Sequence, residues 1–143
     1  MINAKTLPVF AGGTSATLNQ NTDLNGIKHT QDAAFDFGGA AEHIYLKLFW
    51  GGITLEGNGS SERNFTFNMP VVIGGEQIWN TATKKNVVFN APVTDEEGES
   101  YDIVKDGKGT VYFNAPNTFK GDLHITNGVI VVGENGTLGD SEN

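Results

Sequence analysis

Three similar stretches of sequence decide the fold of this chain: Asn64-Phe-Thr-Phe67-Asn68-Met-Pro70, Asn86-Val-Val-Phe89-Asn90-Ala-Pro92 and Thr110-Val-Tyr-Phe113-Asn114-Ala-Pro116. Each consists of residues that favour β-strands and ends in Phe-Asn-x-Pro. The phenylalanines follow one another at intervals of 22 and 24 residues, and three of the chain's four prolines occupy the same motif position. The chain therefore contains an internal repeat of about two dozen residues.

A repeat of this length is typical of a β-solenoid, in which every turn of the chain adds short strands to parallel sheets. It is too short for a propeller blade or a helical-hairpin repeat, and no helical periodicity persists along the chain. We therefore predict an all-β fold, a right-handed parallel β-helix (β-solenoid) with about six short rungs. Residues 1–143 are expected to form a single β-helical domain that is a fragment of a larger protein.

The motif has a physical rationale in such a coil, where equivalent residues of successive turns lie about 4.8 Å apart. Phenylalanine at one position stacks on the phenylalanines above and below it, which predicts a core stack of Phe67, Phe89 and Phe113. Asparagine at a corner donates its amide to the next asparagine, which predicts a ladder of Asn68, Asn90 and Asn114. Proline lacks an N–H and belongs just outside the strand. Breaking the ladder with Asn90→Leu is expected to cost about 1–3 kcal/mol.

Other strands are predicted between these anchors, at Val71–Ile73, Gln77–Thr81, 101–104, 122–126 and Val129–Val132. Asn127-Gly128 supplies either a corner of the coil or a hairpin turn, and the period favours the coil. The first sixty residues are less regular. There we expect strands at 35–37, 44–50 and 53–55, a corner at Gly51-Gly52, and a polar corner at 22–30.

Composition narrows the classes of function. Nine basic and seventeen acidic residues give a formal charge of −8, which disfavours nucleic acid as a partner. The chain has no cysteine, so it has neither disulfides nor a cysteine-based metal site. The acidic run between Asp95 and Asp106 lacks the spacing of an EF-hand and is interpreted as a solvated loop.

No catalytic residue, metal ligand or cofactor site is predicted, and the chain is not expected to be an enzyme. The three histidines, at 29, 43 and 124, lack the spacing of a metal motif and are interpreted as unrelated surface or corner residues. A polysaccharide-active β-helix enzyme is the least favoured hypothesis. A glycosidase needs two carboxylates about 5–10 Å apart across a groove. Asp102 and Asp122 are the candidates, since neighbouring rungs could bring them near each other, but the sequence does not show that they share a face.

Four aromatic side chains are candidates for facing a ligand, because an exposed ring can stack on a sugar. They are Trp50, Trp79, Tyr45 and Tyr112. Tyr112 alternates with Phe113 along its strand, so the two side chains are expected to face opposite sides. These residues support a second hypothesis, a glycan-binding or host-surface-binding module.

The segment Lys105-Asp-Gly-Lys-Gly-Thr110-Val-Tyr-Phe-Asn-Ala-Pro-Asn117-Thr-Phe-Lys-Gly121-Asp-Leu-His-Ile125-Thr-Asn-Gly128 resembles the autotransporter-associated β-strand repeat, also called the passenger-associated transport repeat. The matching positions are Lys105, Gly107, Gly109, Thr110, Asn117, Thr118, Gly121, Ile125 and Gly128. Val111, Phe113, Ala115, Phe119 and Leu123 depart from the pattern. Gln77-Ile-Trp79 is similar to the Gln-Thr-Trp that often precedes the repeat, and Leu138-Gly139, after Val129-Ile-Val-Val-Gly133, corresponds to its terminal Leu-Gly. The resemblance therefore covers residues 77–139.

The resemblance implies a passenger-domain segment of bacterial type V secretion, or of a related surface protein. The expected function is a structural β-helical stalk that aids export and contributes to adhesion. The expected location is the cell exterior or the bacterial cell surface, with attachment to the outer membrane in the parent protein. Partners are then neighbouring modules of the same parent protein and host or matrix glycans or proteins. Self-association through unpaired terminal rungs is also expected.

Overall fold

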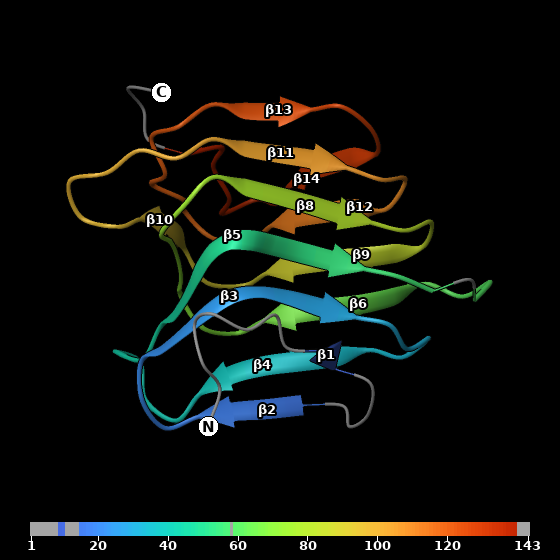
Figure 1. Ribbon diagram of the computed structural model, residues 1–143, viewed down its shortest axis with the longest axis horizontal. Helices are drawn as coiled ribbons and strands as arrows, with labels where there is room; N and C mark the ends of the chain where they lie inside the picture. Colours follow the sequence, from blue (N-terminus) through green and yellow to red (C-terminus); the bar gives the residue numbers. More distant parts are fainter. Residues whose placement is uncertain (1–8, 11–14, 58, 140–143) are drawn as a thin grey trace.

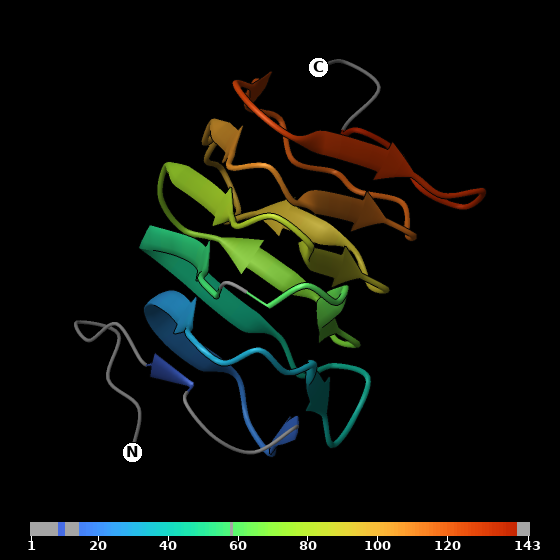
Figure 2. The same ribbon diagram turned by 90° about the vertical axis from the view of Figure 1, so that its right-hand side faces the viewer.

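The chain winds into a coil of stacked parallel strands (Figures 1 and 2). The computed structural model describes residues 9–10, 15–57 and 59–139, while residues 1–8, 11–14, 58 and 140–143 lie outside the described part. Within the described ranges all elements are β-strands, and their pairings are parallel. The predicted all-β parallel β-helix is therefore confirmed.

The strands form two sheets that face each other across the core. The first sheet contains β1 (Val9–Phe10), β3 (Thr22–His29), β5 (Leu46–Leu55), β7 (Val71–Ile73), β8 (Gln77–Thr81), β10 (Val93–Asp95), β11 (Ile103–Asp106) and β13 (Leu123–Ile125). The second contains β2 (Ser15–Leu18), β4 (Phe35–Gly39), β6 (Arg63–Phe67), β9 (Lys85–Phe89), β12 (Thr110–Phe113) and β14 (Val129–Val132).

The six strands of the second sheet correspond to about five complete turns of the chain. The turns are not equally long. Phe67 pairs with Phe89 and Phe89 with Phe113, at the intervals of the sequence repeat, whereas Phe37 pairs with Phe67 and lies 30 residues before it. The turn before it is shorter, since Ala16 pairs with Phe37 at an interval of 21 residues. This uneven spacing is why the repeat is hard to see in the first sixty residues.

Four phenylalanine rings form a continuous column in the core. The ring centroids of Phe67 and Phe89 are 5.1 Å apart and those of Phe89 and Phe113 are 5.6 Å apart, with interplanar angles of 9° and 20°. Phe37 extends the column, 5.7 Å from Phe67 at an angle of 3°. All four side chains are buried. Parallel register places each ring directly over the one below, and burial of these large apolar surfaces stabilises the coil.

The asparagines that follow the phenylalanines form a ladder at the corner. The Asn90 amide donates to Asn68 Oδ1 at 2.9 Å, and the Asn114 amide donates to Asn90 Oδ1 at 3.0 Å. Their backbone N–H groups continue the sheet, since Asn90 N donates to the Phe67 carbonyl and Asn114 N to the Phe89 carbonyl, each at 2.9 Å. The ladder side chains are exposed to water, unlike the phenylalanine column.

Gln77 holds the bend between β7 and β8. Its side-chain amide nitrogen donates to the carbonyls of Leu48, Phe49 and Gly75 at 3.2, 2.7 and 3.1 Å, and its carbonyl oxygen accepts the indole N–H of Trp79 at 3.1 Å. Both side chains are buried. A buried polar side chain with all its groups paired satisfies backbone carbonyls that the bend leaves without partners in the sheet.

Lys105 has the same function at the corner that follows β11. Its side chain is fully buried, and its ammonium donates to the carbonyls of Asp106, Gly107 and Asn127 at 2.6, 2.9 and 3.3 Å. Desolvation lowers the pKa of this lysine, and the nearby carboxylate of Asp106 opposes that shift. Gly107 has a φ of 76°, which favours glycine. Both residues of the Lys-x-Gly pattern therefore serve the same corner: Lys105 binds its carbonyls and Gly107 adopts its backbone conformation.

Asn117 joins three turns of the coil. Its side-chain oxygen accepts the N–H of Val93 at 2.9 Å in the turn before, and its side-chain amide donates to the carbonyl of Thr137 at 2.7 Å in the turn after. The side chain is buried, so these bonds replace water that cannot reach the backbone there.

Two predictions for the first sixty residues are wrong. The segment 22–30, expected as a polar corner, is mostly strand β3, in which Leu24, Ile27 and His29 are buried. The expected corner at Gly51-Gly52 lies inside one long strand, β5, which joins the two strands predicted at 44–50 and 53–55. The strand can continue here only because residue 52 is glycine: its backbone lies so close to the next turn that an added Cβ would be 2.2 Å from the carbonyl oxygen of Ile78.

The remaining strands lie close to their predicted places. β7, β8 and β14 have the predicted bounds, and β4 begins at Phe35 as expected. β11 begins two residues after the predicted start at 101, and β13 is shorter than 122–126. Asn127-Gly128 joins strands of different sheets, which excludes the hairpin alternative at this position.

The ladder gives the first testable prediction. Asn90→Leu removes one side-chain hydrogen bond on each side, and we expect a loss of about 1 kcal/mol in the free energy of unfolding, measured by urea denaturation. This is the low end of the range expected from sequence, because exposed amides leave no buried group unpaired. Asn135→Leu, at an exposed asparagine outside the ladder, is the control. Equal midpoints for the two variants would contradict a stabilising ladder.

Candidate functional site

The predicted ligand-facing aromatics do not form a common surface. Trp50 is 70% exposed, whereas Tyr45 and Tyr112 are partly buried. Trp50 belongs to β5 in the first sheet and Tyr112 to β12 in the second. Tyr112 lies on the outer face, as its alternation with the buried Phe113 predicts.

The prediction for Trp79 is wrong, because this side chain is fully buried. It packs against Phe89 and Phe113, with ring centroids 5.0 and 6.0 Å away, and its indole N–H is bonded to Gln77. Alternation along β8 accounts for this position: Gln77, Trp79 and Thr81 point inward while Ile78 points outward. Trp79 is therefore a core residue and cannot reach a ligand.

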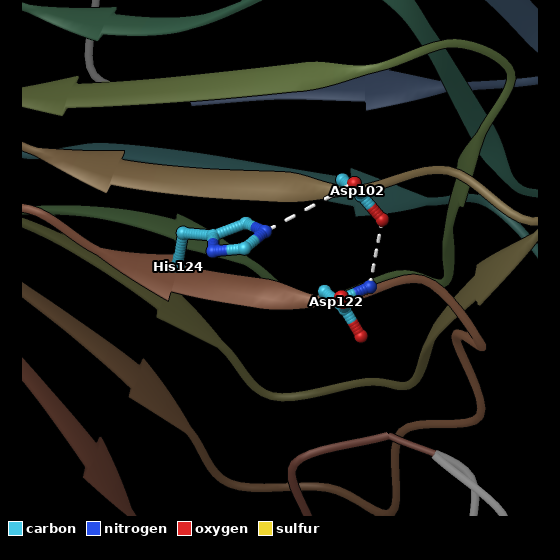
Figure 3. A group of neighbouring side chains, drawn as sticks. All are labelled: Asp102, Asp122 and His124. Carbon is cyan, nitrogen blue, oxygen red and sulfur yellow. Dashed lines mark hydrogen bonds and ion pairs between the residues drawn. The ribbon is translucent and has the colours of Figure 1, made fainter.

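Three side chains that could hold a metal ion gather where β11 and β13 begin (Figure 3). They are Asp102, Asp122 and His124, whose potential ligand atoms all lie within 4.8 Å of one another. His124 Nε2 lies 4.0 Å from Asp102 Oδ2, and both side chains are about half exposed. His124 points outward from β13, as its alternation with Leu123 and Ile125 predicts.

Asp102 also has a structural role, which it shares with Glu76. Asp102 Oδ1 accepts the backbone N–H of Asp122 at 2.8 Å, and the N–H of Asp102 itself donates to Glu76 Oε2 at 2.8 Å. Glu76, Asp102 and Asp122 directly precede β8, β11 and β13, which pair in register. The carboxylates of Glu76 and Asp102 thus each satisfy the first N–H of the turn above, and this column accounts for their position.

Two carboxylates and an imidazole are a reasonable donor set for a divalent transition metal. Sequence reasoning placed Asp102 and Asp122 on neighbouring rungs but missed their proximity to His124. The sequence did contain a signal for the proximity of the two aspartates. They are 20 residues apart, which equals the length of this turn, since Ile103 pairs with Leu123. For acid–base cleavage of a sugar chain the pair is poorly placed, because the two groups lie at an open corner and one oxygen of Asp102 is bonded to the backbone.

A second charged group lies at the rim of the coil near β4, β6 and β9, where only its lysine is buried. The Lys85 side chain is only 3% exposed, and its ammonium contacts Asp32 Oδ1. Arg63 donates to the Asp32 carbonyl at 3.1 Å and lies 3.7 Å from its carboxylate. The hydrogen bond from Lys85 is the main reason that the pKa of Asp32 is lowered. These contacts join three successive turns.

His29 lies at the edge of this group and is buried, contrary to the expected surface or corner position. Its ring packs against Phe35 and Phe65, with centroids 5.9 and 5.5 Å away. Its Nε2 atom has no hydrogen-bond partner. Desolvation, and then the positive charge of Lys85, lower the pKa of this histidine. The folded chain therefore favours neutral His29.

The acidic run is mostly a solvated loop, as predicted. Residues 97–100 are exposed, and Glu96 forms an ion pair with Lys47 of β5. The hydrogen bond with Glu96 is the main reason that the pKa of Lys47 is raised. The loop is thus fixed to the first sheet at one end.

His29 makes stability depend on pH. Its folded pKa lies below the unfolded value of 6.5, so the unfolded state binds more protons between the two values. We expect the free energy of unfolding to decrease as the pH falls below about 6.5, measured as the urea midpoint at pH 7.5 and 5.5. His29→Leu should flatten this decrease, while the control His43→Gln, at an exposed histidine, should keep it. An equally steep decrease in both variants would contradict the assignment.

Comparison of the chain with protein-family models, with curated proteins and with solved structures gives no match. Among the described residues there is no helical segment of the length and hydrophobicity that a membrane crossing needs.

Proposed function

We propose that this chain is a structural β-helical module of a secreted or cell-surface bacterial protein, in which it forms part of a stalk, aids export and contributes to adhesion. The proposal rests on what the repeat residues do in the structure. The phenylalanines, asparagines, Gln77, Lys105 and Asn117 all connect one turn to the next. The phenylalanines, Gln77, Lys105 and Asn117 are also buried, away from any ligand. A repeat whose side chains serve only stacking fits a scaffold.

The resemblance to the passenger-associated repeat supports the secretion part of the proposal. Its motif positions between 77 and 139 include the residues that hold the corners, such as Gln77, Lys105, Gly107 and Asn117. Each new turn of a solenoid is stabilised mainly by the turn already formed. Sequential folding outside the cell would therefore retain each exported segment and favour further export.

The last described turn offers a surface for a neighbouring module. Ile125 and Val132 occupy positions that register with buried Lys105 and Phe113, yet they are 54% and 42% exposed. Leu138 beside them is 51% exposed. An apolar end with the edges of β13 and β14 suits the next turn of a β-helix, or a second copy of the chain.

Export should depend on the stability of the coil. The test places the chain in a type V passenger with an N-terminal epitope tag and measures tag exposure to antibody on intact bacteria. Phe89→Ala empties part of the core column at a cost of about 3–5 kcal/mol and should reduce surface exposure of the tag severalfold. Val88→Ala, at the adjacent outward-facing residue, should leave exposure unchanged. Equal exposure for both variants would contradict a folding-assisted export role.

A second candidate function, a glycan-binding or host-surface-binding module, is favoured by one observation. Trp50 presents a large aromatic side chain at 70% exposure on the outer face of the first sheet. A flat exposed ring is the usual stacking surface for a sugar. Tyr45 and Tyr112 are less suitable, because both are partly covered.

This candidate is tested on a glycan array with the purified chain and its Trp50→Ala variant. Reproducible signals that fall at least about tenfold in the variant would favour binding, since loss of one stacked ring costs about 1–3 kcal/mol. Ile78→Ala, at another exposed apolar side chain of the same sheet, is the control. Signals that persist in Trp50→Ala would contradict this site.

A further inference from the structure

A pocket of about 530 Å³ lies on one corner of the coil. Its walls come from three successive connections, β5–β6, β8–β9 and β11–β12. The lining residues are Gly57, Gly59, Ser60, Ala82, Thr83, Lys84 and Lys108. The volume is within the range of small-molecule sites, and the lining contains two ammonium groups, two hydroxyl groups and no carboxylate.

Lys84 and Lys108 come to this pocket from successive turns of the coil. Lys84 lies three residues before Val87 and Lys108 three residues before Val111, and these two valines pair in the second sheet. Paired strands are about 4.8 Å apart, so the two connections that carry the lysines lie at the same corner. The Lys84 ammonium also donates to the Ser60 carbonyl at 2.7 Å, which holds it against the pocket wall.

Two of the carboxylates near the pocket have cationic partners, since Asp32 is bound by Lys85 and Arg63 and Glu56 forms an ion pair with Lys28. Glu62 accepts a hydrogen bond from the neutral Asn86 amide at 2.6 Å. Within the described ranges neither Lys84 nor Lys108 has an ion-pair partner. In a chain with a formal charge of −8, two such cations in one pocket make a local positive site that attracts an anion.

The backbone conformation of Lys84 indicates that a lysine side chain is needed at this position. Its φ is 62°, and no other described residue except glycine has a positive φ. Glycine or asparagine adopts this conformation with less strain. Strained residues of this kind occur preferentially at ligand-binding sites, and here the strained residue carries one of the two ammonium groups.

We propose that this pocket binds an anionic sugar residue, with its carboxylate or sulfate group between the ammonium groups of Lys84 and Lys108. Ser60 and Thr83 supply hydroxyl groups within the same pocket for the sugar hydroxyls. The proposal is independent of the stalk role and of the Trp50 surface, because it uses residues of a different corner. It predicts affinity for acidic polysaccharide at this site.

The test is a titration of the ¹⁵N-labelled chain with trigalacturonate at low ionic strength, followed by NMR. Amide shifts should cluster at residues 57, 59, 60, 82–84 and 108, and the apparent Kd should weaken at least about tenfold in 0.5 M NaCl, because ion pairing at a surface site is screened. A sulfated disaccharide tests whether sulfate replaces carboxylate, and maltotriose tests the neutral sugar. Binding of either anionic sugar at this corner supports the proposal.

The double substitution Lys84→Gln with Lys108→Gln should weaken binding at least about tenfold. Lys120→Gln, at an exposed lysine outside the pocket, should not. Lys84→Gly removes the charge and relieves the positive φ, so it separates loss of binding from loss of fold, which the urea midpoint monitors. An unchanged Kd in the double variant, equal binding of maltotriose, shifts confined to other surfaces, or absence of shifts at millimolar ligand would each overturn the proposal.

Discussion

The whole structure depends on direct stacking of equivalent residues from one turn to the next. In a parallel coil the backbone hydrogen bonds fix this spacing, so a side chain that packs well on a copy of itself is favoured at every turn. Phenylalanine satisfies the condition in the core, where four rings from Phe37 to Phe113 overlap almost face to face. Asparagine satisfies it at the corner, because one side chain both donates and accepts.

Corners are the weak points of such a coil, because the backbone leaves the sheet there and its polar groups need other partners. This chain supplies those partners from buried polar side chains. Gln77, Lys105 and Asn117 each bind backbone groups in more than one place. Lysine is an unusual choice for a fully buried position, but its three N–H donors face three carbonyls, so the charge is solvated by the backbone. The remaining acids and bases lie outside or at the rim, where their pairing ties successive turns together.

The candidate sites differ in how far sequence reasoning could reach them. Alternation along a strand correctly predicted that His124 and Tyr112 point outward. For Trp79 the same rule was not enough, because the sequence did not show which face of β8 is buried. Two groups depend on which turn lies over which. One is the cluster of Asp102, Asp122 and His124, and the other is the pair of Lys84 and Lys108 in one pocket. Neither has a local motif, since the partners are separated by a full circuit of the chain.

The amino-acid pattern is enough to predict the coil, because stacking acts on residue types at a fixed period, and the Phe-Asn-x-Pro motif occurs three times at that period. The same pattern predicts most strands after residue 63, where turns of similar length keep it in phase. The course of the first turns depends instead on packing in three dimensions, because close approach of the glycines at 26, 51 and 52 allows continuous strands in place of corners. Whether an individual polar or aromatic side chain is buried or exposed also depends on packing. His29 and Trp79 are buried against Phe65 and Phe89, which are distant from them in sequence.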